Sequence, residues 1–226
     1  MTRLHDIEAC VFDAYGTLFD FNSAAARCRD VLGDKAEELS AMWRTKQLAY
    51  TWLRGLMGKH ADFWQVTGDA LDFCLETMGI RGAALRARLM DCYKNLDAFP
   101  EVPGVLKRLK AAGMKTAILS NGTPAMLDAV VSHTGTGALF DALLSVESVG
   151  VYKPHPSVYK MCVERLGVPA GRIAFQSSNA WDAVAAATFG MKVVWINRYG
   201  QRRERLTAQP DVEGRTLDDL LPALGL

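Results

Sequence analysis

The chain carries Val11-Phe12-Asp13-Ala14-Tyr15-Gly16-Thr17 close to its start, where a carboxylate directly follows a short apolar run. A run rich in β-branched and aromatic residues that ends at a glycine-containing break is typical of a buried strand, here expected over residues 9–12. Asp13 is then expected at the carboxyl end of that strand. Ligands bind at this edge in open α/β sheets, because loops, helix N-termini and free backbone N–H groups converge there. An isolated Asp in this pattern often only caps a turn, so its role depends on the rest of the chain.

Length and composition restrict the classes of protein. With 226 residues, the chain suits one α/β domain with an insertion, or two small domains. Half of the residues are hydrophobic, the formal net charge is +1, and no long block of like charge occurs. This argues against a nucleic-acid-binding surface and against a polybasic membrane patch. We therefore expect a small molecule as the partner, with no nucleic acid and no membrane.

The N-terminal residues and the cysteines indicate the compartment. The start of the sequence lacks the apolar core of a signal peptide, and no apolar run approaches the roughly 18 residues that a membrane helix needs. The cysteines are odd in number and lack Cys-x-x-Cys spacing, which argues against a disulfide framework or a zinc site. Both observations favour a cytoplasmic protein whose cysteines serve in packing: Cys10, Cys28, Cys74, Cys92 and Cys162.

From residue 100 onward, start and stop signals of helices alternate with short apolar strands. Pro lies in the first turn of the expected helices at Pro103, Pro124 and Pro156, and Gly follows the ends of helices at Gly167 and Gly190. We expect helices over 103–112, 124–133, 156–166, 180–189 and 216–224, with Thr123 and Asn179 among their caps. The expected strands cover 115–119, 142–146, 172–175 and 192–196, and the Arg-rich segment after Arg198 is expected to be a loop. This alternation predicts a Rossmann-like, doubly wound parallel sheet of the α/β class.

Residues 18–98 break this alternation. They are mainly helical in pattern and rich in apolar and aromatic residues, and a single connection rarely needs so many residues. We therefore expect an α/β core formed by residues 1–17 and 99–226, with residues 18–98 inserted as a helical cap subdomain over the strand ends. Most of the cap aromatics are expected to serve as its own core.

Four polar turns follow different strands of the expected sheet. They are Asp13 to Thr17, Ser120-Asn121, Lys153, and Ser177-Ser178-Asn179-Ala180-Trp181-Asp182. Together they resemble the four motifs of the haloacid dehalogenase superfamily, in which a nucleophilic Asp is joined by a Ser or Thr, a Lys and an acidic motif. The resemblance covers most of the chain and implies the same HAD-like core and cap.

Most members of this superfamily are phosphatases, and their chemistry makes different demands. A phosphate monoester is a dianion with a poor leaving group, so Mg²⁺ and a proton donor are needed. The family places that donor two residues after the nucleophile, where this chain has Tyr15. It also uses further acids in the fourth motif, where this chain has Ser177-Ser178-Asn179 and keeps only Asp182. The proton donor and part of the metal cage are missing.

A 2-haloalkanoate needs neither group, because halide leaves as a weakly basic anion. The chain resembles the L-2-haloacid dehalogenase branch in detail, with Asp-Ala-Tyr-Gly-Thr-Leu at 13–18, Ser-Asn-Gly at 120–122 and Tyr-Lys-Pro at 152–154. Cap residues 43–48 and 50–54 also resemble the cap helix of this branch, where one arginine faces the site. The resemblance implies hydrolysis of short-chain (S)-2-haloacids to (R)-2-hydroxy acids, with inversion and without metal or other cofactor.

The resemblance implies a role for each catalytic residue. Asp13 attacks the halogen-bearing carbon and forms an ester that water then cleaves. Lys153 keeps Asp13 ionised and oriented. Asp182 holds Lys153 and helps to position or activate the water, while Asn179 and Ser177 share its network and Thr17 holds Asp13.

A second set of residues is implied to bind the substrate. Ser120 and the backbone N–H groups of Ala14 and Tyr15 hold the carboxylate, and Arg44, Asn121 and Trp181 surround the departing halide. Tyr159 matches a family tyrosine near the lysine. Three of these residues have a structural alternative: a turn cap for Ser120, a surface salt bridge for Arg44, and a helix packing position for Tyr159. His133 and His155 have no family role, and His155 is expected to cap a helix.

Three other functions remain open from the sequence. The same fold supports a phosphatase or nucleotidase, a silent pocket for small carboxylates, and a haloacetate dehalogenase that also accepts fluoroacetate. Exposed-looking apolar cap positions around Trp52, Leu53 and Leu56 are compatible with the homodimers common in the family.

Overall fold

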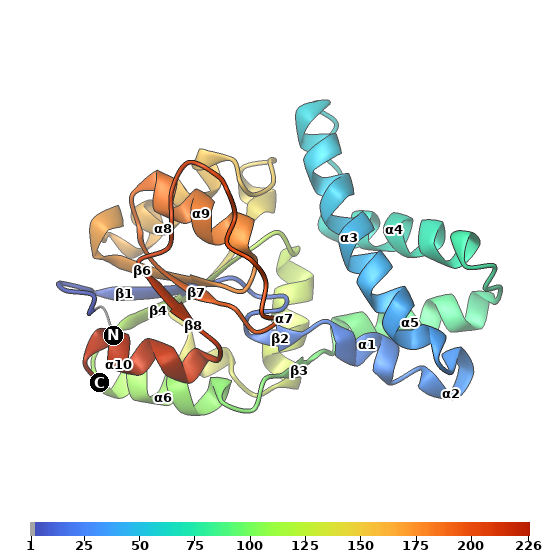
Figure 1. The fold of residues 1–226 in the computed structure, drawn as a ribbon, viewed down its shortest axis with the longest axis horizontal. Helices are drawn as coiled ribbons and strands as arrows, with labels where there is room; N and C mark the ends of the chain where they lie inside the picture. Colours follow the sequence, from blue (N-terminus) through green and yellow to red (C-terminus); the bar gives the residue numbers. More distant parts are fainter. Residues whose placement is uncertain (1–2) are drawn as a thin grey trace.

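The protein, described here over residues 3–226 by a computed structural model, is built around one six-stranded sheet (Figure 1). The strand order is β5-β4-β1-β6-β7-β8, and every neighbouring pair is parallel. The predicted parallel, doubly wound sheet is confirmed. The strands are β1 (Ala9–Phe12), β4 (Lys115–Ser120), β5 (Ala142–Ser145), β6 (Ile173–Ser177), β7 (Lys192–Ile196) and β8 (Val212–Gly214).

Helices cover both faces of this sheet. Figure 1 shows α8 (Pro156–Leu166) and α9 (Ala180–Phe189) on one side, with α6 (Val102–Ala111) and α10 (Leu220–Leu224) on the other. The remaining core helix is α7 (Pro124–His133). These helices begin and end within a residue or two of the predicted bounds, except that 216–224 contains a 3₁₀ turn at Leu217–Asp219 before α10.

Local caps explain why the helix bounds were predictable. The hydroxyl of Thr123 accepts a hydrogen bond of 3.2 Å from the backbone N–H of Met126 at the start of α7. The His155 ring accepts one of 3.3 Å from the N–H of Ser157 at the start of α8, which confirms its predicted capping role. Gly167 ends α8 in the left-handed region at φ 64°, a conformation that costs glycine little. Each signal acts within a few residues of the helix end.

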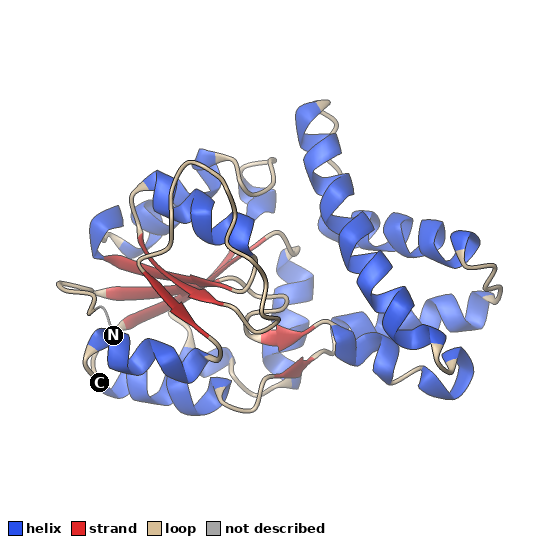
Figure 2. Cartoon of the chain, in the orientation of Figure 1, coloured by secondary structure: helices blue, strands red, loops and turns tan. Residues whose placement is uncertain are grey.

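A separate helical unit lies to one side of the sheet (Figure 2). It is formed by α1 (Asn22–Ala26), α2 (Arg29–Leu32), α3 (Lys35–Leu56), α4 (Phe63–Thr77) and α5 (Ala83–Lys94). Trp43, Phe63 and Leu71 are buried in it, whereas Leu56 is 87% exposed. No helix of residues 3–226 combines the length and the apolar character needed to cross a bilayer.

The sequence did not predict three short strands. β2 (Phe19–Asp20) and β3 (Asp97–Ala98) pair antiparallel where the chain leaves and re-enters the core. β8 pairs with the edge of the sheet, next to Asp211, whose carboxylate accepts from the N–H of Val193 at 2.8 Å. Segments of two or three residues are too short for an apolar alternation, so their pairing depends on the tertiary structure.

Candidate active site

The carboxyl ends of the central strands bring the four polar turns to one edge of the sheet. Asp13 follows β1, and its backbone N–H donates to the carbonyl of Gln176 on β6 at 2.8 Å. Ser120 ends β4, Lys153 lies in the loop before α8, and Asn179 lies between β6 and α9. The edge faces α3 and the start of α4 in the helical unit, so residues from six parts of the chain surround one cavity.

The carboxylate of Asp13 is held by three donors. Its Oδ1 accepts from Lys153 Nζ at 3.1 Å, and its Oδ2 accepts from Asn179 Nδ2 at 2.9 Å and from Thr17 Oγ1 at 3.3 Å. The Thr17 oxygen in turn accepts from the backbone N–H of Ser178 at 2.8 Å. Asp13 is only 6% exposed, so these donors replace much of the water that would otherwise solvate its charge. A fixed, anionic oxygen is the arrangement that a nucleophilic carboxylate requires.

Lys153 is buried between two carboxylates. Its Nζ donates to Asp13 and, at 2.9 Å, to Oδ2 of Asp182, and lies 5.1 Å from the centre of the Phe175 ring. Burial opposes the ammonium charge, but the two carboxylates outweigh it, and the pKa of Lys153 is raised above its ordinary value. The side chain therefore stays protonated at neutral pH.

Asp182 is fully buried behind Lys153. Its Oδ1 accepts from the hydroxyl of Tyr159 at 2.6 Å, and burial raises the pKa of this carboxyl against the favourable charge of Lys153. Asp182 therefore has a stronger tendency to take up a proton than an exposed aspartate has. A series of hydrogen bonds thus runs from Tyr159 through Asp182 and Lys153 to Asp13. These four side chains come from three different segments of the sequence.

Like Asp182, the predicted residues Tyr159 and Ser177 do not line the cavity. The Tyr159 ring is buried against Phe175 and Phe189, and its hydroxyl is occupied by Asp182. Tyr159 was predicted to contact the substrate. The structure shows instead that its hydroxyl supports Asp182. Ser177 is also buried, and its hydroxyl accepts from the backbone N–H of Asn179 at 3.1 Å, with no direct bond to Asp182 or Lys153 among residues 3–226. Ser177 was predicted to share the hydrogen-bond network of Asp182. The structure shows instead that it supports the turn that carries Asn179.

Asn179 also departs from the prediction in one respect. It occupies the residue before α9, yet its side chain makes no capping bond to that helix. The amide instead donates to Asp13, and its oxygen accepts from Arg44. The Asn179 side chain thus binds Asp13 and Arg44 in place of the backbone of α9. Sequence spacing alone does not reveal which of these two arrangements forms.

One wall of the cavity is formed by the turn after β4. The Ser120 hydroxyl accepts from the N–H of Gly122 at 3.0 Å, and Asn121 Oδ1 accepts from the N–H of Lys153 at 3.0 Å. A Cβ at position 122 would lie 2.9 Å from the Tyr15 ring, so glycine is required for this turn to pack against it. Within the described part of the chain, the backbone N–H groups of Ala14 and Tyr15 have no hydrogen-bond acceptor, which leaves them able to bind an anion.

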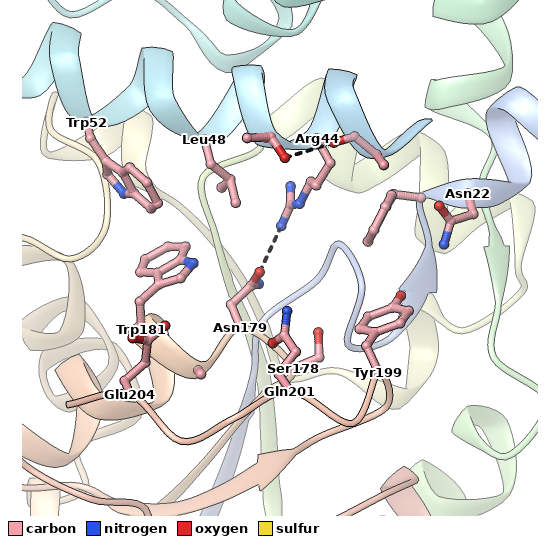
Figure 3. A pocket seen from close by; sticks show the side chains of 14 residues that line it. Asn22, Arg44, Leu48, Trp52, Ser178, Asn179, Trp181, Tyr199, Gln201 and Glu204 are labelled. Carbon is pink, nitrogen blue, oxygen red and sulfur yellow. Dashed lines mark hydrogen bonds between the residues drawn. The ribbon is translucent and has the colours of Figure 1, made fainter. Parts of the chain in front are cut away.

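Arg44 reaches the cavity from α3. Its Nη2 donates to the carbonyl of Tyr15 at 3.2 Å and to Asn179 Oδ1 at 3.4 Å, and its guanidinium carbon lies 5.2 Å from the centre of the Phe21 ring. Figure 3 shows the guanidinium directed from α3 toward Asn179. Over residues 3–226 no carboxylate lies within 4.0 Å of this guanidinium, whereas Lys153 contacts two. Arg44 therefore contributes an unneutralised positive charge.

The cavity is small and partly apolar. It leaves about 10 Å³ for the centre of a water-sized molecule, far below the roughly 300 Å³ at which sites for drug-sized ligands begin. An outer pocket shares several of its walls, and there Trp52 of α3 packs edge-on against Trp181 of α9 with ring centres 5.3 Å apart (Figure 3). The inner cavity is lined by Asp13, Tyr15, Arg44, Leu48, Phe63, Ser120, Asn121, Lys153, Asn179 and Trp181.

Two of these lining residues were missed as site residues. Leu48 lies four residues after Arg44 on α3, and Phe63 is the first residue of α4. The i, i+4 spacing on a helix could have placed Leu48 on the same face as Arg44. No comparable signal marks Phe63, because its place depends on how α4 packs.

The donor set does not fit the Mg²⁺ that most members of the superfamily use. Mg²⁺ takes oxygen ligands in octahedral geometry. Both oxygens of Asp13 instead face nitrogen donors, Lys153 on one side and Asn179 on the other. Over residues 3–226 no cluster of three or more His, Cys, Asp or Glu side chains could hold a metal ion.

Comparison with known proteins relates this site to established families. The family described as haloacid dehalogenase-like hydrolase matches residues 7–190. The (S)-2-haloacid dehalogenase of Pseudomonas sp. (strain YL) is 48% identical over 212 residues, 93% of this chain and 91% of that protein. The (S)-2-haloacid dehalogenase 1 of Pseudomonas sp. (strain CBS-3) is 47% identical over 199 residues, 88% of each chain.

A solved structure adds a chemical clue. The L-2-haloacid dehalogenase from Xanthobacter autotrophicus, solved with chloropropionic acid covalently bound, superposes with a TM-score of 0.89 at 37% identity. The match covers 97% of this chain and 100% of that one. The relatives are therefore similar along nearly the whole chain, both helical unit and sheet included.

Proposed function

Because the chain belongs to the haloacid dehalogenase-like hydrolases, we propose that it is an (S)-2-haloacid dehalogenase, a hydrolase acting on carbon–halide bonds. The reaction converts a short (S)-2-haloacid and water into the (R)-2-hydroxy acid, halide and a proton. The observation that carries this proposal is the anionic Asp13, held by Lys153 and Asn179 in a small cavity whose other charged group is the unneutralised Arg44.

The first step is displacement at carbon. A carboxylate oxygen of Asp13 attacks C2 of the substrate from the side opposite the halogen, the new C–O bond forms, and halide leaves with the bonding electrons. Backside attack inverts the configuration at C2. Arg44, Asn121 and Trp181 are proposed to surround the departing halide, because a guanidinium, an amide N–H and an aromatic edge all present positive potential to an anion. A weakly basic leaving group needs no proton donor, consistent with Tyr15 two residues after the nucleophile.

The substrate carboxylate is proposed to bind at the turns that follow β1 and β4. Ser120 and the backbone N–H groups of Ala14 and Tyr15 supply donors there. The N–H groups after β1 have no other acceptor in the described chain, so a substrate carboxylate would satisfy them. Held in this way, the short substrate places C2 next to Asp13.

The second step is hydrolysis of the ester on Asp13. Water attacks the carbonyl carbon of the ester, the bond to the product oxygen breaks, and the 2-hydroxy acid leaves with a proton from the water. Asp182 is proposed to assist this proton transfer, because burial raises its pKa, and Lys153 then rebinds the regenerated carboxylate. Thr17, Ser177 and Tyr159 are proposed to act indirectly, by holding Asp13, Asn179 and Asp182.

We propose that both steps proceed without a metal ion. Asn179 supports this, because its amide nitrogen occupies the Asp13 oxygen that Lys153 leaves, and both oxygens of the remaining acid, Asp182, already accept from Lys153 and Tyr159. The same observation disfavours the phosphatase alternative, which needs the metal to neutralise a dianion.

The decisive test offers purified protein (S)- and (R)-2-chloropropionate, chloroacetate and fluoroacetate, each with and without EDTA. We expect chloride from the (S) enantiomer, an (R)-lactate product on chiral chromatography, and equal rates with EDTA. Retained configuration would contradict direct displacement by Asp13. No halide from any compound, together with EDTA-sensitive hydrolysis of an aryl phosphate, would replace the proposal with a phosphatase.

The pH dependence of turnover provides a further prediction. The carboxylates of Asp13 and Asp182 outweigh burial and raise the pKa of Lys153, so the ammonium persists up to about pH 10 and is lost only above the ordinary lysine value of 10.5. The stability that it contributes is likewise present below about pH 10 and lost above. Steady-state kcat should show no alkaline decline below about pH 10 while circular dichroism reports a folded protein. An alkaline limb near pH 8 in folded protein would contradict this assignment.

A homodimer is also proposed. Near the end of α3, Leu53 is 52% and Leu56 87% exposed, and Met57, which follows the helix, is 63% exposed. Their spacing of three and four residues places these apolar side chains on one face of the helix. Burial of this face against a second copy would remove apolar area from water.

A further inference from the structure

The interior of the helical unit contains a buried polar network next to Arg44. Gln47 lies on α3, three residues after Arg44, and is 1% exposed. Its neighbours Thr67 on α4 and Tyr93 on α5 are also buried. A buried amide is costly unless its donors and acceptor are satisfied, so the partners of Gln47 are informative.

Each polar atom of the Gln47 amide has a partner. Its Nε2 donates to Thr67 Oγ1 at 2.7 Å and to the Tyr93 oxygen at 3.1 Å, while its Oε1 accepts from Arg44 Nη1 at 2.9 Å and from the Tyr93 hydroxyl at 3.3 Å. The network dictates the orientation of the amide. Thr67 donates its own proton to the carbonyl of Phe63 at 2.6 Å and must accept from Gln47, and a guanidinium has donors only.

This network continues to the nucleophile. Arg44 donates to Gln47 through Nη1 and to Asn179 through Nη2, and Asn179 donates to Asp13. The Gln47 bond is the shortest hydrogen bond of the Arg44 guanidinium, since those to Tyr15 and Asn179 measure 3.2 and 3.4 Å. An arginine has several rotatable bonds, and a rigid acceptor for its Nη1 reduces the orientations that the guanidinium samples.

We propose that Gln47 is a positioning residue that fixes the Arg44 guanidinium against the departing halide. This inference rests on the proposed function and extends it to a side chain that does not line the cavity. The displacement step needs positive potential at one point beside C2, and preorganised donors are most effective when they do not have to reorient during the reaction. Gln47 holds the Arg44 guanidinium in a fixed orientation from inside the helical unit.

The test is single-turnover halide release by Gln47→Met with (S)-2-chloropropionate and (S)-2-bromopropionate. Met fills nearly the same volume and removes the acceptor, and a hydrogen bond to a charged group is of a size that predicts a roughly 10- to 100-fold slower release of chloride. Chloride is the poorer leaving group and depends more on electrostatic stabilisation. We therefore expect a smaller loss for bromide, so that the bromide-to-chloride rate ratio rises several-fold. A merely structural role would slow both halides equally.

Two companion variants separate the outcomes. Thr51→Val, one turn further along α3, removes a buried hydroxyl that donates to the carbonyl of Leu48 at 2.7 Å, and it should leave the halide ratio unchanged. Tyr93→Phe removes one partner of Gln47 and should shift the ratio in the same direction by less. It serves as the test if Gln47→Met does not fold, which thermal unfolding would report.

The contradicting results are distinct. An unchanged ratio in Gln47→Met, with a raised ratio in Arg44→Lys, would overturn the role of Gln47 and leave that of Arg44 intact. Unchanged ratios in both variants would remove Arg44 from the halide site as well. No halide from the wild-type protein would instead overturn the proposed function itself.

Discussion

Asp13→Asn is expected to abolish halide release, with a fall of at least about 10⁴-fold in kcat, the scale seen when a nucleophile is removed. The amide oxygen is a weak nucleophile and cannot form the ester. The side chain keeps its shape, and its oxygen can still accept from Lys153, so the fold should persist. Halide release and intact-protein mass spectrometry after mixing with substrate measure the effect, and the mass of the variant should not increase.

Asp141→Asn is the matched control. Asp141 also binds a lysine and a backbone N–H, since it accepts from Lys110 Nζ at 2.7 Å and from the N–H of Thr116 at 2.8 Å, but it lies outside the cavity. It should retain wild-type kcat. Halide release by Asp13→Asn within tenfold of wild type, after deamidation is excluded by peptide mapping, would remove Asp13 as the nucleophile.

Lys153→Met is expected to lower kcat by roughly 10³-fold and to destabilise the protein. Lys153 is 1% exposed and is the ammonium partner of two buried carboxylates. Breaking a buried ion pair by removing one partner costs about 3–5 kcal/mol. Asp13 also loses the ammonium donor that orients its Oδ1, so its nucleophilic oxygen is less well positioned.

The pH dependence of stability identifies the cause. Burial raises the pKa of Asp182, and without the opposing charge of Lys153 this pKa lies still further above that in the unfolded chain. Stability is then greatest where Asp182 is protonated and falls as pH rises above the ordinary aspartate value of about 4. The midpoint of thermal unfolding of Lys153→Met should therefore fall between about pH 5 and 8 relative to wild type. Lys160→Met, whose lysine is 66% exposed and pairs with Glu164 on one helix face, should show no such difference.

Parallel curves for Lys153→Met and wild type would mean that the Asp182 carboxylate becomes solvated when the lysine is removed. Wild-type turnover by a folded Lys153→Met would exclude its role beside Asp13. The two results address the structural and the chemical parts of the assignment separately.

Local signals explain the accuracy of the fold prediction. Thr123-Pro124 at the start of α7 and Gly167 at the end of α8 act through bonds to residues within one turn. The apolar run at β1 is fully buried because it lies between β4 and β6. The three short strands were missed because they contain no repeating pattern of their own.

The sequence predicted most of the residues of the site, but not how all of them are arranged. Asp13, Lys153 and Asn179 meet as expected, although 140 residues separate Lys153 from Asp13 and 166 separate Asn179 from it. The sequence did not reveal that the Tyr159 hydroxyl donates a hydrogen bond to Asp182. It also did not reveal that Gln47 holds Arg44, since a glutamine on an amphipathic helix usually faces water.

The sequence by itself determined the alternation of strands and helices, the edge of the sheet that carries the site, and the set of charged groups that favours displacement at carbon. These follow from patterns that extend over a few residues and from the chemistry of the side chains. Only the tertiary structure decided which donor faces each oxygen of Asp13, which residues line the cavity, and what holds Arg44. Hydrogen-bond geometry depends on strand order and on how α3 packs over the sheet, and both are set by contacts between residues far apart in the chain.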